Sequence, residues 1–374
     1  MTLPCTSLFV GCLLALLACA PAHAQSPLCS MPPTPDCLYA PPSRHAFTAY
    51  ERNTSYTDAA GRQRQVKVML RVPIGAPMPS PWPVVVWSHG GADGKASPAH
   101  SMVEWSELTA AAGYLTVSIA HAGRDAASRE ALCRSPALAI NDRATCEQFK
   151  YLNWDRPHDI RAVLDELERL AAGEFRGQID LRRIAVGGHS AGSGGALTVA
   201  GARRIFIDHA IELSDARPIA FLAFSPQQPG SEGFFDTRFQ KPSHSWAHIR
   251  RPVLAATGDG DSTCNTGVVV QGCVGDTPFG RRIGFQRLPA DGNKYELYLH
   301  DANAFHTLFE LNAGKCPQLQ VPQLFCDDAV RWLSSTALAF LDAHVRQGMP
   351  AALQWLHSDR IERASGGVAE WQRQ

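Results

Sequence analysis

The chain has 374 residues, of which 45% are hydrophobic and 19% are charged, and its 35 basic residues balance 35 acidic ones. This composition is typical of a soluble globular protein with a sizeable core. The sequence contains no long run of one charge, and this absence argues against nucleic acid and anionic membranes as partners.

The first 24 residues resemble an export signal. Residues Leu8–Ala20 form an apolar run that is too short to span a bilayer, and Ala22–Ala24 is a small-residue cleavage site. The segment before the run lacks Lys and Arg, and the residues around Cys19 loosely resemble a bacterial lipobox, so a lipid anchor at Cys19 is an alternative. The sequence therefore predicts a secreted or periplasmic bacterial protein, with a Pro-rich leader over residues 25–45.

The cysteines indicate the same kind of compartment. An even number in close sequential pairs predicts up to four local disulfides in an oxidising compartment, although the sequence does not fix their connectivity. The sequence has no C-x-x-C and no close Cys/His cluster, which argues against a zinc site. The eight cysteines beyond the signal are Cys29, Cys37, Cys133, Cys146, Cys264, Cys273, Cys316 and Cys326.

The apolar pattern of the mature chain predicts an α/β fold. Residues 65–73 alternate between apolar and polar, which predicts a half-buried strand of an antiparallel N-terminal hairpin. The later strands are short and apolar on both faces, as a sheet covered by helices on both sides requires. These strands are predicted at Pro83–Ser88, Tyr114–Ala120, Arg183–Gly188, Pro218–Phe224, Pro252–Gly258 and Tyr295–His300.

Amphipathic helical patterns separate several of these strands. The clearest covers Asp159–Ala172, and others run from about Ser101 to Ala112 and from Asp327 to about Val345. Strands that alternate with helices predict a mostly parallel sheet with helices on both faces. We therefore expect one domain over residues 46–347 and a C-terminal tail over residues 348–374.

The segment RIAVGGHSAGSGG, Arg183–Gly195, contains a G-x-S-x-G pattern around Ser190. The pattern follows a predicted strand and precedes a helix start, which is the setting of a serine nucleophile held in a strained turn. A phosphate-binding loop is disfavoured, because no Lys and Ser or Thr follow the last glycine and no G-x-G-x-x-G opens a first βαβ unit. Ser190 is therefore the predicted nucleophile.

A serine nucleophile needs a histidine base and a carboxylate that orients the base, in the chain order Ser, acid, His. Asp259 and Asp261 follow the predicted strand 252–258, and His300 and His306 follow the next one. Asp261 is favoured because it lies further into its loop, and His306 because it lies beyond its strand end. Asp259, as a turn residue, and His300, as a packed histidine, are the alternatives.

The same chemistry needs two N–H donors for the negative oxygen that forms during attack on a carbonyl. One is predicted at Ala191, the residue after the nucleophile, and the other in the loop after an early strand. The sequence His89-Gly90-Gly91 supplies that loop, and Gly91 is the favoured donor. This chemistry requires no cofactor and no metal.

Together these motifs resemble the α/β-hydrolases over roughly Val84 to Phe340, and are similar to the branch that holds platelet-activating-factor acetylhydrolases, dienelactone-hydrolase-like proteins and bacterial polyester hydrolases. The resemblance implies the α/β-hydrolase fold and an exported serine hydrolase that cleaves carboxylic esters of small or polymeric substrates. It rests on WSHGGADG, YLTVSIAHAGRD, RPHDIRAVLDEL, GHSAG, TGDGD and AFHTLF.

One position departs from that branch. The animal acetylhydrolases carry the acid after the strand that follows the nucleophile, where this chain has AFSPQQPG with Ser225. This difference puts phospholipid specificity in doubt. An acyltransferase, a peptidase and a non-catalytic binding protein are alternative functions. We also expect disulfides Cys264–Cys273 and Cys316–Cys326 to hold the acid and base loops in place.

Overall fold

A computed structural model of the chain describes residues 37–75, 81–91, 97–207, 209–227, 246–262, 277–346 and 349–374. The predicted export signal, the alternative anchor Cys19, and Cys29, Cys264 and Cys273 lie outside these ranges.

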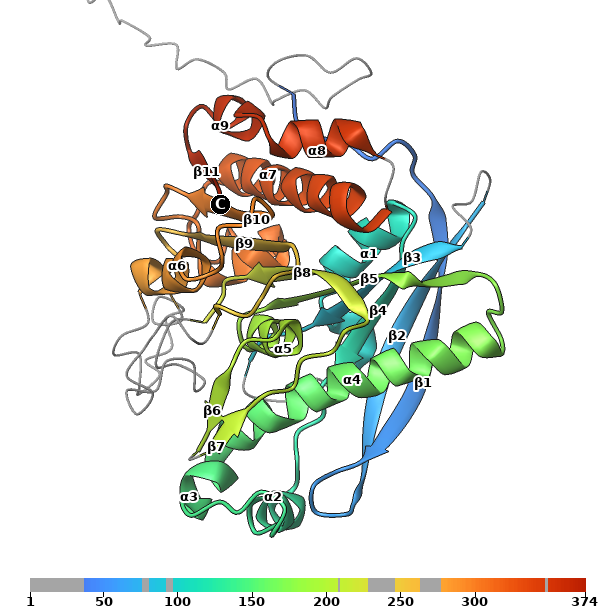
Figure 1. The fold of residues 1–374 in the computed structure, drawn as a ribbon. Helices are drawn as coiled ribbons and strands as arrows, with labels where there is room; N and C mark the ends of the chain where they lie inside the picture. Colours follow the sequence, from blue (N-terminus) through green and yellow to red (C-terminus); the bar gives the residue numbers. More distant parts are fainter. Residues whose placement is uncertain are drawn as a thin grey trace, which may run out of the picture.

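The centre of the fold is a nine-stranded sheet (Figure 1). Its six middle strands are parallel, and β1, β2 and β11 run antiparallel to their neighbours. This arrangement confirms the predicted mostly parallel sheet with its N-terminal hairpin. In spatial order the strands are β1 (Ala46–Thr57), β2 (Gln63–Ile74), β4 (Leu115–Ala120), β3 (Trp82–Ser88), β5 (Ile179–His189), β8 (Pro218–Phe224), β9 (Val253–Gly258), β10 (Lys294–Leu299) and β11 (Ala369–Arg373).

Helices cover both faces of the sheet because successive side chains of each strand point to opposite sides. Val85 of β3 packs in one core with α1 (Val103–Ala111) and α7 (Gln323–Leu341). Its neighbour Val84 packs in a second core with α4 (Tyr151–Ala172), α5 (Ala191–Ala200) and α6 (Pro278–Gln286). In Figure 1, α7 and α4 accordingly lie on opposite sides of the strands.

Helix α4 begins earlier than the predicted start near Asp159. Its first turns hold the buried polar residues Asn153, Asp155 and Arg156, and Pro157 lies inside the helix. Buried polar groups produce no apolar periodicity, which explains why the sequence pattern detected only the later turns.

The fold extends beyond residue 347, where the sequence placed the end of the domain. Residues 350–373 form α8 (Pro350–Leu356), α9 (Arg360–Ala364) and β11, which pairs with β10. Trp355 and Ile361 are buried in the core beside α7. Both helices are too short to show a helical apolar repeat in the sequence. The end of the predicted leader also packs against this region, because Trp355 donates to the carbonyl of Cys37 and Tyr39 donates to Asp342.

Smaller elements join these layers. Two of the predicted local disulfides are present, Cys133–Cys146 and Cys316–Cys326, and Cys37 is also disulfide-bonded. Within the described ranges no helix combines the length and apolar character needed to cross a bilayer. The remaining elements are α2 (Ala126–Cys133), α3 (Arg143–Thr145), β6 (Arg204–Phe206), β7 (His209–Ile211), the 3-10 helices η1 (Pro98–His100), η7 (His306–Glu310) and η8 (Ala313–Lys315), and the π-helical turns η2 (Cys146–Lys150) and η9 (Asp342–Arg346).

Candidate active site

Ser190 lies on a sharp turn between the end of β5 and the start of α5. Its backbone has φ +52° and ψ −121°, a conformation that side-chain-bearing residues rarely adopt. A Cβ atom on Gly188 would lie 2.4 Å from the backbone of Gly192, and one on Gly192 would lie 2.0 Å from the carbonyl oxygen of Ser88. Glycine is therefore required on both sides of the turn, as the sequence pattern predicted.

The turn places Ser190 at the start of helix α5. Ser190 occupies the N-cap position, and its side chain makes no capping hydrogen bond, while Ala191 is the first helical residue. The free N–H groups at a helix start carry a partial positive charge. The predicted oxyanion donor Ala191 thus belongs to an electropositive helix end directly after the predicted nucleophile.

Asp261 and His306 come together at the same edge of the sheet. Asp261 follows β9, His306 opens η7 after β10, and His306 Nδ1 lies 2.8 Å from Asp261 Oδ1. The N–H of Ser190 donates to the carbonyl of Phe224 at the end of β8, which places the turn at this edge too. Within the described ranges the Ser190 hydroxyl makes no hydrogen bond; such contacts are often loose before a substrate binds.

The alternative residues Asp259 and His300 form a separate cluster nearer the surface. Tyr298 Oη donates to Asp259 Oδ1 at 2.6 Å, and His300 Nε2 lies 2.6 Å from Glu370. Asp259 Oδ2 and His300 Nδ1 are 3.8 Å apart, and both side chains are almost half exposed. The structure therefore pairs the two favoured residues with each other and the two alternatives with each other.

The surroundings of Asp261 and His306 favour an ionised acid and a neutral base. Burial alone raises the pKa of Asp261, but the nearby charge of Arg281 and hydrogen bonds from His306 and Thr257 outweigh it and lower the pKa to about 2. Burial, and then the neighbouring His189, lower the pKa of His306. At neutral pH the imidazole is therefore uncharged and able to accept a proton.

The loop after β3 reaches the turn through Gly90. A Cβ on Gly90 would lie 2.9 Å from His189 Nδ1 and 3.0 Å from Ser190 Cβ, whereas a Cβ on the predicted donor Gly91, which has φ +87°, would have no atom of the described residues within 4 Å. Arg156 of α4 donates to the carbonyls of His89 and Gly91. Sequence reasoning missed this role of Arg156, although the motif that contains it was part of the resemblance.

A second chain of Ser, His and Asp lies beneath this loop. Ser88 Oγ is 2.7 Å from His121 Nε2, and His121 Nδ1 is 2.9 Å from Asp159 Oδ2. Arg64 makes two hydrogen bonds to Asp159, of 2.7 and 2.9 Å. Burial lowers the pKa of His121 to about 4. The three residues Ser88, His121 and Asp159, which we call the inner chain, are at most 1% exposed and have no access to a substrate.

His189, the first variable residue of the G-x-S-x-G pattern, connects the turn to the base. Its Nε2 lies 3.0 Å from the carbonyl oxygen of His306, so an N–H there donates to that carbonyl. Its Nδ1 lies 3.0 Å from Glu310 Oε1, at the distance of an ion pair but without hydrogen-bond alignment. No motif in the sequence indicated this link.

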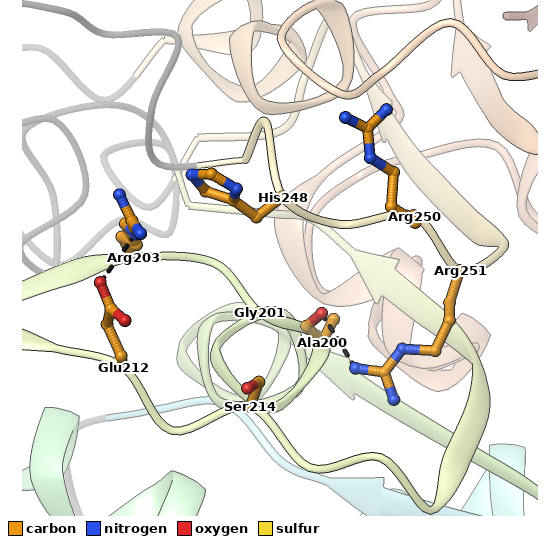
Figure 2. A pocket seen from close by; sticks show the side chains of 8 residues that line it. All are labelled: Ala200, Gly201, Arg203, Glu212, Ser214, His248, Arg250 and Arg251. Atoms are coloured by element: carbon orange, nitrogen blue, oxygen red, sulfur yellow. Dashed lines mark hydrogen bonds and ion pairs between the residues drawn. The ribbon is translucent and has the colours of Figure 1, made fainter.

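Two cavities bear on where a ligand can bind. One, of about 210 Å³, adjoins His306 and is lined by Ser262, Phe305, His306, Thr307, Lys315, Gln318 and Leu319. The other, of about 260 Å³, lies at the C-terminal end of α5, the end away from Ser190 (Figure 2). There Arg203 pairs with Glu212 and Arg251 donates to backbone carbonyls, so these two cations already have partners. Across the described ranges no cluster of His, Cys, Asp and Glu is arranged to hold a metal ion.

Comparison of the chain with models of known protein families gave no match, and comparison with curated proteins gave none either.

Proposed function

We propose that this chain is an exported serine hydrolase with an α/β-hydrolase fold that cleaves carboxylic esters. The observation that carries the proposal is the strained Ser190 at the start of a helix, at the same sheet edge as the Asp261–His306 pair. The sheet order and the position of each residue at a strand end support the same fold.

In the proposed reaction, Ser190 Oγ attacks the ester carbonyl while His306 Nε2 takes its proton. Asp261 holds the Nδ1 proton of His306 and stabilises the imidazolium that forms. The N–H groups of Ala191 and Gly91 stabilise the negative oxygen. The imidazolium then protonates the departing alcohol, which leaves an acyl group on Ser190. Water activated by His306 attacks this acyl group and releases the carboxylic acid.

The cavity beside the proposed base His306 is the candidate position for part of the ester. Its volume is about 210 Å³, and its lining combines the apolar side chains of Phe305 and Leu319 with Lys315. The local disulfides support an oxidising compartment. Whether the chain carries a cleaved signal or a lipid anchor at Cys19 is decided by N-terminal sequencing and lipid labelling of the exported protein.

The test is ester hydrolysis by purified protein across p-nitrophenyl esters of increasing chain length, a lactone and a polyester film. Ser190→Ala is expected to abolish hydrolysis, and Ser193→Ala, which removes only a hydroxyl that donates to the backbone carbonyl of Ser190, to lower it far less. Full activity of Ser190→Ala contradicts the proposal. Product analysis with added alcohol or amine acceptors, together with assays on peptides, separates hydrolysis from acyl transfer and from peptidase activity.

A further inference from the structure

Ser225 touches both members of the acid–base pair. It follows β8, and its Oγ lies 2.8 Å from Asp261 Oδ1 and 2.7 Å from His306 Nδ1. With the 2.8 Å contact between Nδ1 and Oδ1, these three atoms form a closed triangle. We propose that Ser225 is a positioning residue: its hydroxyl holds the Asp261 carboxylate and the His306 ring together so that the Nδ1 proton faces Asp261 and Nε2 is free. This inference rests on the proposed function.

The balance of donors and acceptors in the triangle favours this tautomer. Asp261 is ionised and only accepts, while the Ser225 hydroxyl has one proton to donate. When His306 carries its proton on Nδ1, that proton and the hydroxyl proton both point toward the carboxylate, and the hydroxyl oxygen faces the N–H. When the proton is on Nε2, the unprotonated Nδ1 of His306 faces Asp261 Oδ1, and both atoms are acceptors. The single Ser225 hydroxyl proton can then satisfy only one of them. Bonds to a carboxylate are the stronger ones, so the first arrangement is preferred.

The backbone at Ser225 is held in a costly conformation. Its φ is +47°, in the left-handed region that favours glycine, and the residue is fully buried. Its N–H donates to the carbonyl of Ala256, and its carbonyl accepts from Arg281, whose Nε also donates to the carbonyl of Asp261. A side chain kept at such a position despite the backbone cost is consistent with a specific task for its hydroxyl.

Thr257 provides a matched comparison. Its Oγ1 donates to the other carboxylate oxygen of Asp261 at 2.7 Å. Among the residues that the structure describes, Thr257 makes no hydrogen bond to His306, so it supports the carboxylate alone. The difference between Ser225 and Thr257 is therefore the contact with the imidazole.

The experiment compares Ser225→Ala, Ser225→Gly and Thr257→Val for kcat, KM and the free energy of unfolding on a p-nitrophenyl ester. We expect both Ser225 variants to lower kcat about 10-fold to 100-fold with little change in KM, because a hydrogen bond to a charged group is lost. Thr257→Val is expected to lower kcat less. Ser225→Gly relieves the backbone cost, so it is expected to be at least as stable as Ser225→Ala while remaining slow. If Ser225 had only a structural role, a variant that keeps its stability would not lose kcat.

Proton NMR provides a readout that needs no substrate. The low-field signal of the His306 Nδ1 proton, assigned by its loss in His306→Ala, is expected to shift or broaden in both Ser225 variants and to stay in place in Thr257→Val. The inference is overturned if folded Ser225 variants keep the wild-type kcat and signal, or if Thr257→Val matches them in both. Failure of the proposed function is a different result, since Ser190→Ala then keeps its activity or no ester is hydrolysed by the wild type.

Discussion

The protein contains two sets of Ser, His and Asp, namely the inner chain and the candidate site of Ser190, His306 and Asp261, and the two sets differ in access rather than in composition. In the inner chain, Ser88 sits on β3 and its hydroxyl already bonds to His121. At the candidate active site, Ser190 stands on a strained turn, its hydroxyl unpaired within the described ranges. The inner chain is closed to solvent, whereas Ser190 is 9% and His306 7% exposed.

The difference shows that the presence of these three residue types is not by itself evidence of a reactive site. The candidate site adds a helix start beside the serine and a cavity beside the base. The inner chain instead has Arg64 beside it, whose guanidinium pairs with the carboxylate of Asp159. The inner chain also lies under the loop that carries Gly90, because the N–H of His121 donates to His89 Nε2. We therefore expect the first to govern the rate of reaction and the second to govern stability.

The largest expected effects on kcat and on stability come from changing the aspartate of each set, Asp261 and Asp159, to asparagine. Asp261→Asn is expected to lower kcat by about 10⁴-fold, because the amide favours the wrong tautomer of His306. Asp159→Asn is expected to lower the free energy of unfolding by about 3 kcal/mol, because it removes the negative charge that accepts two hydrogen bonds from buried Arg64 and leaves that cation its longer pair with Asp155, of 3.4 Å. Steady-state kinetics and urea denaturation of both variants measure the two effects.

These two variants also provide each other's control. Folded Asp159→Asn is expected to keep kcat within about tenfold of the wild type, since its carboxylate contacts no reacting group. A 10⁴-fold loss of kcat in folded Asp159→Asn, or an unchanged kcat in Asp261→Asn, contradicts the assignment of catalysis to the candidate site and of stability to the inner chain.

Protonation of the two buried histidines is expected to change different measured quantities, kcat/KM for His306 and the free energy of unfolding for His121. The neutral form of His306 is the base and its pKa is lowered, so the acid limb of kcat/KM is expected to be centred below pH 6.5. An acid limb centred above pH 6.5 contradicts this reading.

The inner chain responds to the same acid through stability. The folded pKa of His121 is about 4, below its ordinary value of 6.5. The neutral, buried His121 therefore contributes fully to the free energy of unfolding above pH 6.5. As the pH falls from 6.5 to about 4, the free energy of unfolding is expected to decrease by about 3 kcal/mol. Denaturation curves of wild type and His121→Gln across this range test the effect, because the glutamine does not titrate. Equal pH dependence in the two proteins excludes His121 as its source.

The smallest expected effect is at His189, which connects the turn to the base. His189→Leu removes the hydrogen bond to the His306 carbonyl, worth about 1 kcal/mol, so kcat is expected to fall about fivefold. Because His189 lowers the pKa of His306, its removal is expected to move the acid limb of kcat/KM to higher pH. A limb that stays in place or moves to lower pH is inconsistent with this role.

The parts of the fold that the sequence predicted are those with a local pattern. Apolar runs located the parallel strands, and the glycines around Ser190 predicted the strained turn. The start of α4 was missed because Asp155 and Arg156 are buried through polar partners rather than apolar ones. The C-terminal elements were missed because each is too short for a periodic signal.

The candidate site divides in the same way. The contact between Asp261 and His306 was predictable because each follows a strand in the expected chain order, and parallel strands end at one edge. The contacts of Ser225 were not, because its partners lie 36 and 81 residues away and leave no local pattern. The inner chain likewise joins residues from β3, from the segment after β4 and from α4.

The most direct test of the central claim is covalent labelling with a fluorophosphonate, which reacts with an activated serine hydroxyl. Intact mass followed by peptide mapping identifies the labelled residue in the folded protein. We predict one equivalent of label on Ser190 and none on Ser88. Label on Ser88 or on another side chain, or no label while esters are still hydrolysed, contradicts the assignment of Ser190 as the nucleophile.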